Sequence, residues 1–337
     1  MFRQKPDIVD ICINYYADYY VVASSSPSSI NLLNVDNKPS ILVVKMMQSI
    51  RTLKAIVLLL TTISGFSINS SIVNEYCRTW SRNDQPGVHI LFSTAVTTLL
   101  QQCSITLDGF LYIFGCYMMF VHEVYVIDFT ILYFLIELSF WHATWLSVYY
   151  CLKLVNLPYR IFLQMRLRFS SFVPLLLIGS AIGSLLINAP FLWTVHITFL
   201  PNVTEYKYEM FYPHTIGNMV FGCCFPFLIT FTAIVLSISS LLSHIMKVKS
   251  NESNFRRPQL KAHIRAIRTM VTRLILDLIL CLVSTGLLTS ELTLGTVVDT
   301  ACWIFLMLYP TFQSIIFILG NPKLKEKLFT CRRMRRD

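Results

Sequence analysis

The feature of this sequence that most restricts its fold is a series of seven long apolar stretches separated by polar connections. Each stretch is long enough for an α-helix of about 20 residues, which is the length that crosses the hydrocarbon core of a bilayer. Spanning segments of this kind fold as helices, because their backbone amides find no water inside the bilayer. The sequence therefore predicts an all-α membrane protein, a bundle of seven transmembrane helices at 53–73, 88–108, 126–152, 171–193, 216–242, 269–289 and 297–319.

The balance of charged residues supports this membrane setting. Only 14% of the residues are charged, whereas soluble domains carry about 25%. The formal net charge of +10 could indicate a nucleic-acid partner. We exclude nucleic acid, because the Lys and Arg residues flank apolar spans and so lie where anionic membrane lipid would attract them.

The positive charges also predict how the helices are oriented. Basic residues concentrate in the loop 153–168, the loop 247–268 and the tail 323–336, whereas the connections on the opposite side have Lys207 and several glutamates. Connections rich in Lys and Arg stay in the cytoplasm. We therefore expect a multi-pass plasma-membrane protein with an extracellular N-terminus and a cytoplasmic C-terminus.

The same pattern divides the chain into three parts. Residues 1–52 combine a Ser-rich stretch with a Tyr-rich patch and have no apolar run typical of a signal peptide, so we interpret them as a disordered extension or an artefact of gene prediction. We expect the seven-helix domain at 53–325 and a basic cytoplasmic tail at 326–337. Of the Asn-x-Ser/Thr sequons, the one at Asn202 lies on the predicted extracellular side, so we expect glycosylation there.

Motifs of enzymes and of metal sites are not found in the sequence. It has no Gly-rich phosphate loop, no HExxH and no GxSxG, so we expect neither catalysis nor a cofactor. Its ten cysteines are scattered, mostly within apolar spans, without a CxxC or a Cys/His cluster at metal spacing. We interpret them as small apolar residues and expect no metal.

Glu137 and the pair Arg273–Asp277 are ionisable groups inside the spans, and each allows two interpretations. Glu137 lies near the middle of the third span, where it is either a ligand contact at the floor of a pocket or a neutral acid bonded to a neighbouring hydroxyl. Arg273 and Asp277 are four residues apart and therefore face each other on one side of a helix. This pair either marks a functional position or lets Arg273 snorkel to the membrane surface, and we favour snorkelling.

Several segments carry distinctive patterns that resemble one known family. The third span ends in WHATWLSVYYCLK (141–153), the sixth begins with KAHIRAIRTM (261–270), and YPTFQSIIFILGNPKLK (309–325) ends the seventh. These segments resemble motifs of the taste receptor type 2 family, the bitter taste receptors, and the resemblance covers about residues 65–325. It implies a G-protein-coupled receptor. Departures from the family pattern are Thr98, where the family has an arginine, Gln313 in place of a histidine, and Leu280 in place of an aromatic residue.

The resemblance also implies which residues act. In the family a small agonist binds in the outer half of the bundle and a heterotrimeric G protein binds on the cytoplasmic side. Carried over by position, the ligand-binding residues are Leu132, Tyr133, Ile136, Glu137 and Trp303. Basic residues at the cytoplasmic ends of the third, fifth and sixth spans would face the G protein, although lipid anchoring explains such charges too; they are Lys153, His244, Lys261, Arg265 and Arg268.

Two other functions remain open at this stage. A pheromone receptor of the vomeronasal type 1 family would share the architecture, although the motifs fit the taste receptors better. A small-solute transporter or channel would also place polar groups inside a bundle.

Overall fold

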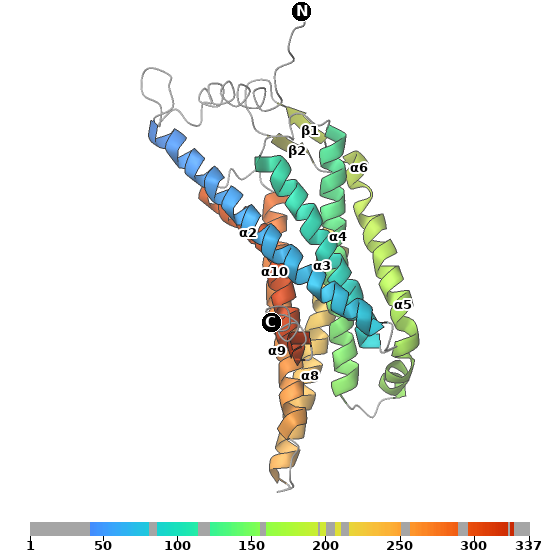
Figure 1. Ribbon diagram of the computed structural model, residues 1–337. Helices are drawn as coiled ribbons and strands as arrows, with labels where there is room; N and C mark the ends of the chain where they lie inside the picture. Colours follow the sequence, from blue (N-terminus) through green and yellow to red (C-terminus); the bar gives the residue numbers. More distant parts are fainter. Residues whose placement is uncertain are drawn as a thin grey trace, which may run out of the picture.

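The computed structural model describes residues 41–80, 86–113, 122–155, 160–194, 196–199, 206–209, 216–250, 257–288, 296–322 and 324–326. Within these residues seven long helices run side by side as one bundle (Figure 1). A short helix and a π-helix accompany them. The elements are α2 (Ile41–Trp80), α3 (Pro86–Ile113), α4 (His122–Leu154), α5 (Arg160–Asn188), α6 (Phe191–Thr194), the π-helix η3 (Met219–Cys224), α8 (Phe225–Ser250), α9 (Arg257–Leu288) and α10 (Thr296–Gly320).

The predicted spans agree with these helices, and the seven-helix fold is confirmed. Six of the helices are long and apolar enough to cross a bilayer among the described residues, and α9 is not one of those six. Most of the helices begin before their predicted limits, whereas α5 ends at Asn188, before its predicted limit. In particular, α2 begins at Ile41 and so reaches back into the segment 1–52.

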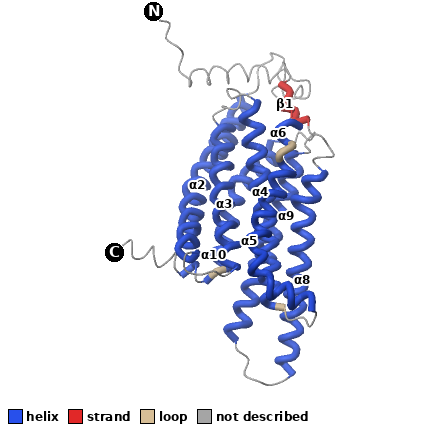
Figure 2. The backbone as a smooth tube through the Cα atoms, turned by 90° about the vertical axis from the view of Figure 1, so that its right-hand side faces the viewer, coloured by secondary structure: helices blue, strands red, loops and turns tan. Residues whose placement is uncertain are grey.

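One small departure from an all-α fold lies between α6 and η3. Strand β1 (His196–Phe199) pairs with strand β2 (Tyr206–Glu209) in an antiparallel hairpin, in which His196 faces Glu209. The predicted glycosylation site at Asn202 falls between the two strands, outside the described residues. The hairpin lies at one end of the bundle (Figure 2).

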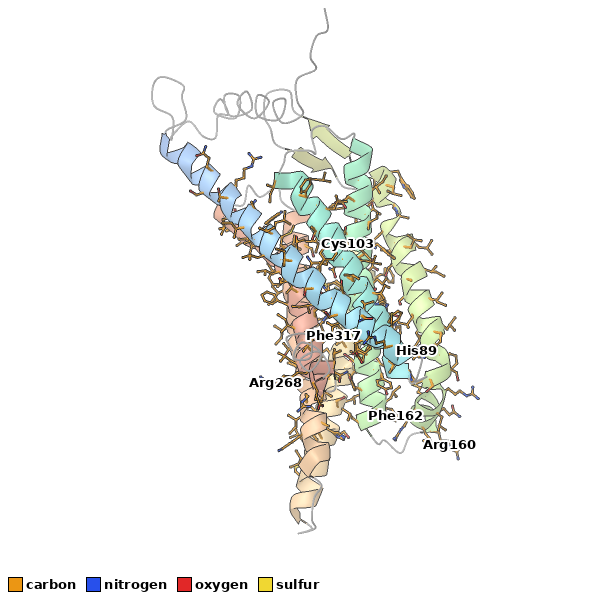
Figure 3. The ribbon with its side chains drawn as sticks, in the orientation of Figure 1. His89, Cys103, Arg160, Phe162, Arg268 and Phe317 are labelled. Carbon is orange, nitrogen blue, oxygen red and sulfur yellow. A yellow bond between two sulfur atoms is a disulfide. The ribbon has the colours of Figure 1, made fainter. Side chains whose placement is uncertain are left out.

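Exposed Lys and Arg residues gather at the other end of the bundle, and we name it the basic end. There α4 ends, α5 begins, and the first turns of α9 present Lys and Arg side chains to the surface. Figure 3 labels Arg160 of α5 and Arg268 of α9 near this end. We name the end with the hairpin the hairpin end.

In this bundle several polar side chains are buried and many apolar side chains are exposed, the reverse of a soluble protein. In the apolar 18-residue stretch of α4, 61% of the stretch is buried, whereas only 17% of the corresponding stretch of α5 is buried. Helix α4 therefore lies at the centre of the bundle and α5 at its margin. Gln101 and Gln102 of α3 are fully buried, whereas Leu175 and Leu186 of α5 are exposed. Apolar side chains face lipid at no cost, and polar ones need partners inside the bundle.

A π-helical turn lies just before Pro226. Proline has no N–H, and its ring would clash with the carbonyl of the residue four positions earlier, which here is Gly222. The wider turn of η3 avoids that clash, with the N–H of Phe225 bonded to the carbonyl of Val220. It also brings Gly222 against α4, where an added Cβ would lie 2.9 Å from the carboxyl carbon of Glu137.

Candidate functional site

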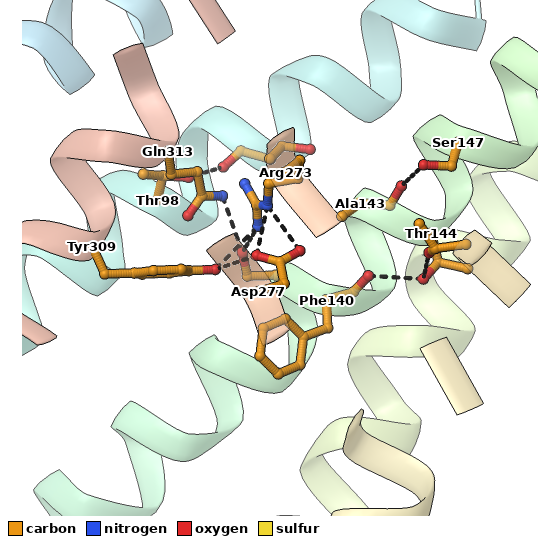
Figure 4. Close-up of polar contacts among 12 residues, drawn as sticks. Thr98, Phe140, Ala143, Thr144, Ser147, Arg273, Asp277, Tyr309 and Gln313 are labelled. Carbon is orange, nitrogen blue, oxygen red and sulfur yellow. Dashed lines mark hydrogen bonds and ion pairs between the residues drawn. The ribbon is translucent and has the colours of Figure 1, made fainter. Parts of the chain in front are cut away.

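Arg273 of α9 is the centre of a polar cluster in the middle of the bundle (Figure 4). Its side chain is 9% exposed. Its Nε donates to both carboxylate oxygens of Asp277, at 2.8 and 2.9 Å. Its Nη2 donates to the hydroxyl of Ser139 on α4 at 2.7 Å and to that of Tyr309 on α10 at 3.3 Å. The predicted pairing with Asp277 is confirmed. The favoured snorkelling interpretation was wrong, because the guanidinium points into the bundle.

Two further bonds close this cluster. The hydroxyl of Tyr309 donates to Asp277 at 2.8 Å, so that carboxylate receives donors from two helices. The amide of Gln313 lies against Ser139 at 3.0 Å. We name these residues the Arg273 cluster: Ser139, Arg273, Asp277, Tyr309 and Gln313.

The Arg273 cluster extends toward α3 through Gln313. With its carboxamide turned so that the oxygen faces donors, Gln313 accepts from Thr98 at 3.0 Å and from Nη1 of Arg273 at 2.5 Å. We prefer this orientation because it gives both amide atoms suitable partners. The family that the sequence resembles has an arginine at the position of Thr98. In this chain the guanidinium of Arg273, from α9, lies next to Gln313, and Gln313 also bonds Thr98.

Glu137 belongs to a second buried polar group, which joins α4, α5 and the start of the fifth long helical stretch, just before η3. Its side chain is 3% exposed, and its Oε2 accepts from Nδ2 of Asn188 at 2.5 Å. Oδ1 of Asn188 in turn accepts from Asn218 at 3.0 Å. The other carboxylate oxygen of Glu137 has no hydrogen-bond partner among the described residues. The acid is thus bonded to a neighbour, as one interpretation expected, although the neighbour is an amide. Its role as a ligand contact remains a prediction.

The other predicted ligand-binding residues belong to neighbouring packing clusters toward the hairpin end. Leu132 packs against the cluster that contains Trp303, and Ile136 lies in the adjacent cluster with Tyr309. Tyr133 packs on a separate pair, Val126 and Phe191. Leu132 also contacts the cluster of Ile136. The structure therefore brings Leu132, Ile136 and Trp303 together and leaves Tyr133 on a different side of α4.

A lysine that the sequence interpretation missed lies beside Trp303. The ammonium of Lys54 on α2 is 5.3 Å from the centre of the indole ring, and the residue is 4% exposed. A cation over an aromatic face is attracted by the quadrupole of the ring. The sequence did contain a signal for it, since Lys54 is a charge within the first turn of an apolar span.

A cleft opens between α4, α8 and α9, closer to the basic end than the predicted ligand residues. The cleft is narrow, with an internal volume of about 20 Å³, and it is lined mainly by apolar side chains together with Thr144, Thr230 and Asp277. Thr144 bonds Thr230 at 3.0 Å and donates to the carbonyl of Pro226 at 3.1 Å. None of the five predicted ligand-binding residues lines this cleft.

The residues predicted to face a G protein lie at the basic end. Lys153, Lys261, Arg265 and Arg268 are exposed, and the ammonium of Lys153 lies 5.7 Å from the centre of the Tyr149 ring. His244 falls within α8, but its side chain lies outside the described part of the chain. The exposed cations form a positive surface that suits either acidic lipid headgroups or an acidic protein.

The cysteines need one correction. Cys223 of η3 and Cys281 of α9 are joined by a disulfide, so the interpretation of every cysteine as a small apolar residue was wrong for these two. The link lies toward the hairpin end, eight residues from Arg273 along α9. It fixes the distance between η3 and α9 at that level.

Comparison with known proteins identifies relatives of this chain. Residues 46–334 match the family described as Taste receptor protein (TAS2R). Over 219 residues the chain is 31% identical to taste receptor type 2 member 119 of Mus musculus, which is 62% of this chain and 64% of that protein. It is 31% identical to member 40 of Gallus gallus over 65% of this chain and 74% of that protein, and 28% identical to member 4 of Gorilla gorilla gorilla over 77% and 90%. The chain thus spans slightly less than two thirds of the mouse relative.

Proposed function

Because this chain belongs to the taste receptor type 2 family, whose members are seven-helix G-protein-coupled receptors, we propose that it detects small bitter molecules and signals to a heterotrimeric G protein. The observation that carries the proposal is the family match over residues 46–334, which includes most of α2 and all of the other six long helices. The bundle supports it, since it combines buried polar side chains with a group of exposed cations at the basic end.

The agonist binds in the half of the bundle near the hairpin end. Leu132, Ile136 and Trp303 supply a shared apolar and aromatic wall. Glu137 lies one residue beyond Ile136 and has a carboxylate oxygen with no partner among the described residues. Lys54 already covers the face of Trp303. We therefore assign the binding of a cationic agonist to Glu137 and that of apolar groups to the wall.

Signalling follows from a shift between two arrangements of the helices. An agonist that binds the open arrangement about tenfold better than the resting one shifts the equilibrium tenfold, which corresponds to about 1.4 kcal/mol. In the open arrangement the basic ends of α8 and α9 move apart, which makes room for the G protein between Lys153 and the cations of α9.

A screen with charged and neutral bitter compounds tests this function. Cells that express the chain with a promiscuous G protein should release calcium with some members of the panel. Glu137→Gln should weaken cationic agonists about tenfold, or about 1.4 kcal/mol, and leave neutral agonists unchanged. Equal weakening of both classes would remove Glu137 from the binding region, and compound-evoked current without calcium release would favour a channel.

The proposed orientation places the hairpin end outside the cell and the basic end in the cytoplasm. Asn202 would then be exposed to the glycosylation machinery, since it lies between the two strands of the hairpin. We expect Asn202→Gln to remove the glycan shift on a gel, with endoglycosidase-treated wild-type protein as the reference. A shift that persists in the variant would contradict this orientation or this site.

A further inference from the structure

We propose that Arg273 is a positioning residue that holds α9 against α4 and α10 in the resting receptor. Its bonds to Ser139 and Tyr309 must break before the basic end of α9 can swing outward. The proposal rests on the proposed function, since it says how that receptor is kept silent without agonist. The residues involved belong neither to the ligand wall nor to the cationic surface at the basic end.

The bonds of Arg273 fall into two kinds, and the difference makes the cluster suitable as a switch. The ion pair with Asp277 lies within α9 and would move together with that helix. The bonds to Ser139 and Tyr309 join α9 to α4 and α10. When α9 moves, only the bonds between helices break. The buried guanidinium keeps its counter-ion in both states, and this avoids the large cost of an uncompensated charge inside the bundle.

The disulfide between Cys223 and Cys281 places the pivot of this motion toward the hairpin end. It ties α9 to η3 at a level about 12 Å from Arg273, whereas the start of α9 at Arg257 lies about 36 Å from the same level, given a rise of about 1.5 Å per residue. Arg273 therefore moves about one third as far as the start of α9 when that helix swings about this level. A displacement of about 1 Å along the bond takes the 2.7 Å contact with Ser139 beyond hydrogen-bonding distance.

The aromatic neighbours of Arg273 add to the resting contacts. The guanidinium carbon lies 5.9 Å from the ring centres of both Tyr309 and Phe317, which are on α10. Both rings are left behind when α9 moves. Removing one hydroxyl from the Arg273 cluster should weaken the bonds between α9 and its neighbours while the charge of Arg273 stays in place. Variants that lose a single hydroxyl are therefore the most informative ones.

Two variants test the proposal, each of which removes a single hydroxyl. Ser139→Ala and Tyr309→Phe should each raise agonist-free signalling about tenfold at equal surface expression, because each loses a hydrogen bond to a charged group. Thr272→Ala is the matched control, since Thr272 is the exposed neighbour of Arg273 on the same helix. Its basal signal should equal that of the wild type.

A distance measurement separates failure of this proposal from failure of the proposed function. Gln164 of α5 and Ala262 of α9 are both exposed at the basic end. Each is replaced by a non-canonical amino acid that carries a spin label, and the distance between the two labels reports the opening without any G protein. We expect longer distances in Ser139→Ala and Tyr309→Phe than in the wild type. Longer distances without calcium signals would support the role of Arg273 and contradict coupling to the G protein.

The opposite results would overturn the proposal. Wild-type distances and wild-type basal signals in both variants would show that Arg273 does not hold α9. Loss of folding in both variants would do the same, because a bond that breaks in a populated open state cannot be essential to the fold.

Discussion

Asp277→Asn is expected to lose about 3–5 kcal/mol of folding free energy and most of its surface expression. Asp277 is the carboxylate that both compensates Arg273, through two bonds from Nε, and receives the hydroxyl of Tyr309. Without it, the buried guanidinium of Arg273 keeps only neutral partners among the described residues. Thermal unfolding of the detergent-purified protein and surface labelling of cells measure the loss.

The matched control for this prediction removes both charges at once. Arg273→Met combined with Asp277→Leu leaves no buried ion, and apolar replacements of buried ion pairs are often neutral or stabilising. We therefore expect the double variant to recover surface expression. We also expect it to signal without agonist, since its contacts to Ser139 and Tyr309 are gone. Normal expression of Asp277→Asn alone would mean that neutral partners suffice for the guanidinium.

Trp303→Ala is the second change with a large expected effect. Trp303 packs with Leu58, Ile105, Ile113 and Met307 at 9% exposure. Truncation of a buried tryptophan leaves a cavity and typically costs about 3–5 kcal/mol. It also removes the aromatic face beneath Lys54. We expect a large drop in thermal stability, measured in detergent, and reduced delivery to the cell surface.

Trp303→Phe separates packing from ligand binding at the same position. It keeps an aromatic ring and most of the buried contact, so its surface expression should stay close to that of the wild type, while agonist potency falls. Val298→Ala on the exposed side of α10 is the control for changes on this helix. If Trp303→Phe left agonist potency unchanged, Trp303 would contribute to packing alone.

Much of the architecture could be predicted from the residues in order. The apolar stretches predicted seven helices because a bilayer admits few other folds, and α2, α3, α4, α5, α8, α9 and α10 lie where they were expected. The spacing of Arg273 and Asp277 predicted their ion pair, since residues four apart share one face of a helix. These conclusions need only the length of the apolar stretches and the helical spacing of side chains along the sequence.

The errors arose where the answer depended on the direction in which a side chain points. Arg273 lies close to the predicted start of the sixth span, where a side chain can snorkel, but its position along the sequence does not say whether it faces lipid or α4. The same limit applies to Glu137, whose partner Asn188 is 51 residues away in the chain, and to Cys223, which pairs with Cys281. No local signal connects residues so far apart. The binding and coupling residues themselves remain predictions.

The sequence by itself determined that this chain is a seven-helix membrane protein, because hydrophobic length and the placement of charge act locally along the chain. Only the tertiary structure decided that an arginine of α9 is held by α4 and α10, and that η3 and α9 are joined. The physical reason is that the rotation of each helix about its axis is set by the packing of all its neighbours together, and this rotation selects which polar side chains meet inside the bilayer.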